Sequence, residues 1–147
     1  MTTREIKEFL GNKIQEWQEK KLAKTERLAV KYPREILEYK PSHGVGEFLP
    51  VFSSSQFAGS KNTGSVVQDE DIRIVVFTAV RVLDQGKYPE EYTDLLKAAL
   101  SGIRMNANRA DKFVHPELIQ WVKDENQYVW YEVTFIVPAV NVQEIGV

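Results

Sequence analysis

The sequence of 147 residues contains no cysteine, which excludes both a disulfide framework and a zinc site built on thiolates. It also has no apolar run near the ~20 residues that a membrane-spanning helix needs. Its charged start, from Met1 to Glu5, is unlike the apolar stretch of a signal peptide. We therefore expect a soluble protein that is not exported through a secretory signal and has no membrane partner.

An excess of charge of one sign is lacking too, because 19 basic and 21 acidic side chains leave a net charge of -2. This balance provides no general attraction to nucleic acid, so sequence-specific nucleic-acid binding is not expected.

Histidine is scarce. We expect His43, beside a Gly-Val-Gly that follows no strand, to be a loop residue rather than part of a phosphate loop. His115 precedes Pro116 and is expected to be a turn residue, since no catalytic partner lies at a recognisable spacing.

The densest acidic run is Asp69-Glu70-Asp71. It lacks the glycine and the terminal glutamate of a calcium loop, so a solvated beginning of a strand is favoured over a cation site. Pairs of carboxylates placed for acid–base catalysis do not stand out from the other acidic residues. The sequence therefore predicts that the protein is not an enzyme, and no catalytic residue, cofactor-binding residue or metal ligand is assigned.

The clearest structural pattern is the segment Tyr128 to Val137. Alternate residues there form a wholly apolar face, and the opposite face is only partly polar, which predicts a central strand covered on both sides. A second long strand is expected from Ile72 to Val82, and a hairpin from Leu118–Val122 through a loop at 123–127. Pro138 is expected to end the Tyr128 strand.

Two helices are expected to pack on these strands. Thr2 and Glu5 have the spacing of a capping box at the start of the first helix, which carries apolar residues at helical spacing as far as Trp17. The second begins at Pro89 and ends at Ser101-Gly102. With no internal repeat, the order predicts a single α+β domain over residues 1–147, with a mostly antiparallel twisted sheet packed by two main helices.

Two segments are left as candidate contact surfaces. Residues 53–64 are rich in serine and glycine and are expected to form a long loop, and residues 138–147 form a partly apolar C-terminal extension. Apolar residues outside the core pattern often mark interfaces. Phe57 folding back on its own sheet, and the extension forming another edge strand of its own subunit, are the competing interpretations. The candidate interface residues are Phe57, Lys61, Asn62, Val140, Val142 and Ile145.

Three segments carry a resemblance to a known family. They are Val66 to Val76, the helix from Tyr92 to Leu100 followed by Ser101-Gly102-Ile103, and Val129 to Phe135 with its Trp-Tyr pair. Together they resemble the tail terminator family of Mu-like contractile-tailed bacteriophages and their prophage relatives. The resemblance runs from the first helix to the last strand, although residues 32–64 are more extended than a minimal member would need.

The resemblance implies a structural protein that forms a ring, by analogy a hexamer, at the head-proximal end of the tail tube. Its partners would be other copies of itself, the tail tube protein, the sheath, and a head-side connector or neck protein, with DNA passing through the ring. It would be assembled in the host cytoplasm and located in the tail or neck of the virion. Two alternatives are another head–tail junction protein (a neck or tail-completion factor) and a small ligand-binding or enzymatic α+β domain.

Overall fold

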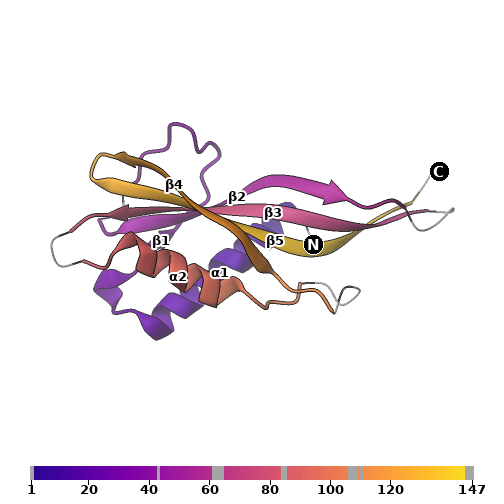
Figure 1. Cartoon of the computed structure of the whole chain (residues 1–147), viewed down its shortest axis with the longest axis horizontal. Coiled ribbons are helices and arrows are strands. Elements are labelled where there is room, and N and C mark those ends of the chain that lie inside the picture. The colour runs from indigo at the N-terminus through magenta and orange to yellow at the C-terminus, as the bar shows by residue number, and fades with distance from the viewer. Residues whose placement is uncertain are drawn as a thin grey trace.

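One five-stranded sheet carries two α-helices on one of its faces (Figure 1). The structure is a computed structural model that describes residues 2–42, 44–60, 65–83, 86–105, 109 and 111–144. In chain order the elements are α1 (Thr3–Lys21), the 3-10 helix η1 (Lys24–Glu26), β1 (Ala29–Val30), β2 (Gly46–Phe57), β3 (Ser65–Arg81), α2 (Pro89–Leu100), β4 (His115–Glu125) and β5 (Tyr128–Glu144).

The strand order across the sheet is β1-β2-β3-β5-β4. β1 pairs with β2 in parallel, and the other three pairs are antiparallel. α1 contacts β1 and β2, whereas α2 contacts β3, β5 and β4, so each helix covers one half of the sheet. The predicted single α+β domain with two main helices on a mostly antiparallel sheet is confirmed.

Both helices begin and end where the sequence indicates. The Thr2 hydroxyl accepts a hydrogen bond from the Glu5 N–H at 3.2 Å, and the Thr2 N–H donates to the Glu5 carboxylate at 3.1 Å. α2 starts with Pro89 at its first position, where the missing N–H costs no hydrogen bond. It is followed by Gly102 at φ 87, a backbone conformation that other residues adopt at a cost. The predicted caps are therefore confirmed.

The main core lies between the helices and the sheet. Alternate residues of β3 and β5 face it, and Val133, Phe135 and Val137 of the predicted Tyr128 strand are fully buried. The opposite side of β5 is buried too, with Tyr128 and Trp130 in a second, smaller cluster. Residues 31–42 have no regular secondary structure and bring Ile36 and Tyr39 onto this face. The prediction of a central strand buried on both sides is confirmed.

The strands continue well past the helices and form a projecting three-stranded arm (Figure 1). The arm consists of Ser53–Phe57 of β2, Ser65–Asp71 of β3 and Pro138–Glu144 of β5. The expectation of one loop over residues 53–64 is wrong in its first part, since β2 runs to Phe57 after a bulge at Ser53. Serines are tolerated there because the cross-strand ladder with β3 satisfies the backbone.

Pro138 does not end the last strand, contrary to the prediction, because β5 continues to Glu144. β4 pairs with β5 only as far as His115 and Ile136, so one side of β5 is already an open edge at Pro138. A proline is acceptable at an edge, where no neighbour requires its N–H. The C-terminal extension through Glu144 is thus a continuation of β5, which is central in the body and lies at the edge of the arm, rather than a separate strand.

The hairpin between β4 and β5 is confirmed as antiparallel, with a tighter turn than the predicted loop over 123–127. The turn is the two residues Asn126 and Gln127, both with positive φ (52 and 71). Turns of this hand match the twist of the flanking strands. β4 therefore extends over His115–Glu125, and it is bulged at Glu117 and Val122.

Candidate functional site

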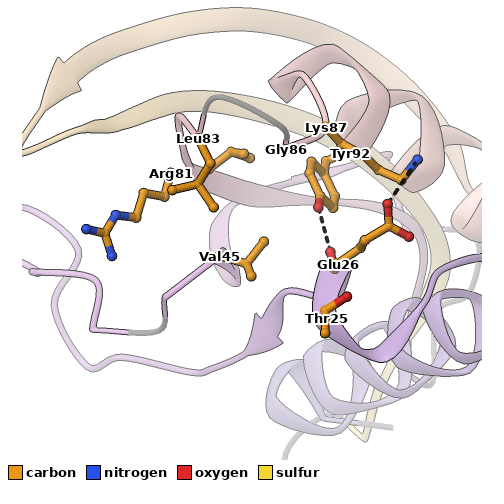
Figure 2. A pocket seen from close by; sticks show the side chains of 9 residues that line it. Thr25, Glu26, Val45, Arg81, Leu83, Gly86, Lys87 and Tyr92 are labelled. Carbon is orange, nitrogen blue, oxygen red and sulfur yellow. Dashed lines mark hydrogen bonds and ion pairs between the residues drawn. The ribbon is translucent and has the colours of Figure 1, made fainter.

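A pocket of about 250 Å³ lies at the end of the body opposite the arm, between η1, the end of β3 and the start of α2 (Figure 2). Tyr92 points into it and donates a hydrogen bond to the Glu26 carbonyl at 2.5 Å. Lys87 lies 3.6 Å from the Glu26 carboxylate and 3.9 Å from Glu91. Burial, followed by the nearby Glu26 and Glu91, raises the pKa of Tyr92 to about 12.

The polar contacts of this pocket centre on Glu26. The hydroxyl of Tyr92 and the ammonium of Lys87 both bind Glu26, which ties η1 to α2. The volume is also below the ~300–1,000 Å³ that is usual for small-molecule sites. The contacts among the described lining residues are those of a structural junction.

A second polar cluster surrounds Glu47, whose side chain is completely buried. Its carboxylate accepts hydrogen bonds from the Tyr39 hydroxyl at 2.5 Å and the Ser42 N–H at 3.1 Å, and Lys31 lies 3.0 Å away. Burial, then the hydrogen bond to Glu47, raises the pKa of Tyr39 above its usual range. This cluster fastens residues 31–42 to the sheet. The sequence pattern did not reveal it, because its members are separated by irregular chain.

The acidic run of β3 is met by an arginine. Arg109 lies 3.0 Å from the Asp71 carboxylate and 3.9 Å from that of Asp69, and it also donates to the backbone carbonyls of Glu70 and Ala139. The guanidinium thus balances these carboxylates at the base of the arm. Within the described part of the chain, no cluster of three or more histidine, cysteine or acidic residues is arranged to hold a metal ion.

The two histidines have separate positions. His43 lies outside the described residues. His115 is the first residue of β4, paired with Ile136, rather than the predicted turn residue. Its exposed ring has Nδ1 3.0 Å from the carbonyl oxygen of Phe113. Pro116 follows at an edge strand, where a proline does not stop pairing.

Three of the candidate interface residues lie on the arm. Phe57, at the end of β2, pairs across the sheet with Glu70, whereas Val140 and Val142 lie on the other side of β3. Because side chains alternate, Phe57 projects from the helix side of the arm and the two valines from the opposite side. Phe57 and Val142 are exposed, at 50% and 58%, and Val140 is half-buried. Lys61, Asn62 and Ile145 lie outside the described residues.

A run of exposed apolar side chains that was not predicted from the sequence lies on β4. This strand forms one edge of the sheet, and most of its side chains are exposed on both faces. Trp121 is 57% exposed, and its indole N–H donates to Asp124 at 2.9 Å. The signal in the sequence was the run Leu118 to Val122, whose apolar residues do not alternate and so cannot all face one core.

A comparison with known families places the chain among phage proteins. A sequence model described as Gp37 protein matches residues 21–146, which is most of the chain. The chain belongs to the Gp37 family. This family is associated with bacteriophages, so the Gp37 assignment confirms the phage origin that the resemblance implied.

No curated protein matches the chain. Across the part of the chain that the structure describes, neither helix is long and apolar enough to cross a membrane.

Proposed function

We propose that the protein is a tail terminator, which forms a ring at the head-proximal end of the tail tube, stops tube growth and joins the tail to the head connector. The observation that carries the proposal is the arm, three paired strands that project beyond the helices (Figure 1). A ring subunit needs a rigid body and a segment that extends to a neighbouring subunit. Paired strands can extend in this way and stay ordered, because the hydrogen-bonded ladder holds them.

Membership of a phage family supports this proposal, and so does the chemistry of the described residues. The carboxylates and cations of the pocket at Tyr92 and of the clusters at Glu47 and Arg109 bind one another. We therefore propose a structural rather than an enzymatic role. Six copies per ring, with contacts to the tube protein and to a head-side connector, are the assembly that the family resemblance implies.

The test is the length of tails made without the protein. In a phage lysate from a strain lacking this gene, electron microscopy should show tubes that overgrow and do not join heads. Wild-type protein supplied in trans should restore normal length. Tails of normal length that fail to join heads would instead indicate a neck or tail-completion factor and exclude the terminator role.

A deletion in the arm gives a second test of the same proposal. A variant that lacks residues 139–147 removes the outer part of β5 and leaves the body of the sheet, including the core at Val133, intact. It should fold, as judged by circular dichroism, and fail to complement the missing gene. Full complementation by this variant would contradict the role given to the arm.

A further inference from the structure

The edge strand β4 carries two bulges that are placed symmetrically along it. Its pairing with β5 skips Glu117 and Val122. Gln120 lies midway between the bulged doublets Glu117-Leu118 and Val122-Lys123. A bulged edge does not pair with a regular strand along its whole length, but it can pair with a strand whose bulges fall opposite its own. A second copy of β4, running antiparallel through Gln120, is such a strand.

The contacts of β4 show which side of the sheet each of its residues faces. Ile119 pairs with Val133 of the main core, so it lies on the helix side. Trp121, two residues further, lies on the same side. On the opposite side, together with Gln120, lie His115, Glu117, Leu118, Val122, Lys123 and Glu125. Directly opposed residues of an antiparallel pair must lie on one side of the sheet, which limits the registers that β4 can use.

Antiparallel pairing of two β4 strands about Gln120 meets this condition along the whole strand. Leu118 falls opposite Val122 of the second copy, so apolar side chains meet on the side away from the helices. Ile119 falls opposite Trp121 on the helix side. Moving the axis by one residue, to Ile119 or to Trp121, sets helix-side residues against residues of the other side. The register is therefore specified by β4 itself.

The charged residues of β4 favour the same register. Glu117 falls opposite Lys123 of the second copy, and opposite charges that face each other across two strands attract. His115 likewise falls opposite Glu125. No two like charges are directly opposed anywhere along the strand. With the axis at Trp121 instead, Glu117 would face Glu125, and the two carboxylates would repel.

We propose that β4 pairs with β4 of a second copy, antiparallel, about a two-fold axis at Gln120, and that the free protein is a dimer. The contact goes beyond the ring proposed above, because a two-fold contact closes on two copies and is separate from the head-to-tail contacts of a ring. Over 11 residues at ~3.3 Å each, the paired edge is about 35 Å long. With a depth of about 20 Å, the sheet and one helix layer, it buries roughly 700 Å² per partner. That is close to the ~800 Å² of stable interfaces.

The helices leave room for this contact. The axis is perpendicular to the sheet, so both copies carry their helices on the same face. α2 contacts β3 and β5 as well as β4, and it leaves Ile119 and Trp121 exposed, at 37% and 57%. Two α2 helices above the two β5 strands would be three strand spacings apart, about 14 Å, against a helix diameter of ~10 Å. The Trp121 rings, each already fixed by a hydrogen bond to Asp124, fill the space between the helices with little further loss of side-chain entropy.

The opposite side of the sheet offers a matching pocket. Leu37 is 89% exposed and lines, with Val122 and Trp130, an apolar pocket of about 150 Å³ between residues 31–42 and β4. Leu118 of the second copy lies opposite Val122 in the proposed register, at the mouth of this pocket. The contact thus covers exposed apolar side chains on both sides of β4.

Crosslinking tests the axis directly, because a residue on a two-fold axis meets its own copy and the chain has no native cysteine. Purified full-length Gln120→Cys, treated with a short bis-maleimide, should yield dimers several-fold more efficiently than Glu16→Cys. Glu16 is the matched control, since it is exposed on α1, which covers the other half of the sheet. A yield from Gln120→Cys no higher than that of the control would overturn the proposal, whatever oligomer the protein forms.

Charge reversal tests the register. Glu117→Lys and Lys123→Glu each set like charges against each other in a dimer of identical copies, so each alone should dimerise about tenfold more weakly in sedimentation equilibrium. An equimolar mixture of the two variants restores both opposite-charge pairs and should dimerise as the wild type does. A mixture that stays as weak as the single variants, with both folded by circular dichroism, would overturn the register. Wild-type protein that sediments as a monomer at concentrations on the order of 100 µM would overturn the contact altogether.

Discussion

The body and the arm share the strands β2, β3 and β5, yet they are stabilised in different ways. In the body, β3 and β5 are covered by helices on one face and partly by residues 31–42 on the other. In the arm, the same strands have half-buried side chains and few apolar contacts, and stability there comes from the ladder and from Arg109 at the base. Burial of apolar side chains stabilises the body, whereas strand pairing and the contacts of Arg109 stabilise the arm.

This difference separates folding from function along a single strand. Residues of β5 up to Ala139 contribute to the main core or to the Arg109 contacts at its border, whereas Val140 and Val142 lie beyond that core. Loops and projections usually carry contacts while a packed scaffold positions them. In the proposed function, one continuous strand does both.

The largest expected effect is from Val133→Asp compared with Val142→Asp, two changes on the same strand. Val133 is completely buried and Val142 is 58% exposed. An unpaired carboxylate in the core costs a large part of the ~5–15 kcal/mol that stabilises a domain, so Val133→Asp should not fold. Val142→Asp should keep a near-native melting curve by circular dichroism. Similar melting temperatures for both would contradict the division into body and arm.

A smaller effect is expected where residues 31–42 attach to the body. Glu47→Ala leaves the Tyr39 hydroxyl and the Ser42 N–H without their acceptor, and the free energy of unfolding should fall by about 2–3 kcal/mol. Glu125→Ala removes a solvent-screened partner of Lys40 and should change the free energy of unfolding much less. Urea unfolding of both variants measures the difference. Equal losses would mean that the buried carboxylate does not hold this segment.

Tyr92 gives the body a sensitivity to alkaline pH. Its folded pKa of about 12 lies above the ~10 of an unfolded tyrosine, so the folded state retains the proton and stability falls as pH rises from about 10 to 12. Tyr92→Phe should lower stability by about 1–2 kcal/mol at neutral pH, because the Glu26 carbonyl loses its donor. It should also make the decline above pH ~10 shallower, and Tyr39 accounts for part of what remains. An unchanged slope in urea midpoints would contradict this role.

The smallest effect on stability is expected from Phe57→Ser, which truncates an exposed side chain on the arm. The free energy of unfolding should change by no more than ~0.5 kcal/mol. Complementation of tail assembly should nevertheless decline if this face of the arm binds a neighbour. Val142→Ser tests the opposite face in the same assay. Undiminished complementation by both would leave the arm without a contact role at these positions.

Periodicity and capping predicted most of the body, because those signals are local. The caps at Thr2 and Pro89 and the central strand through Val133 each follow from neighbouring residues. The arm was missed in part because serines at 53–55 have low strand propensity, and only pairing with β3 keeps them extended. The clusters at Glu47 and Arg109 join residues far apart in the chain, which a single sequence does not reveal.

The long pairing of β3 with β5 has a consequence for how fast the protein folds. Its closest pair, Arg81 and Tyr128, is 47 residues apart in the chain, and its most distant, Ser65 and Glu144, is 79 apart. Closing such long loops costs entropy before any contact repays it. The β4–β5 hairpin, closed by two residues, should therefore form early, before β3 pairs with β5. Pairing then advances from the body outward, so the tip of the arm is the last part of the sheet to form and the first to open.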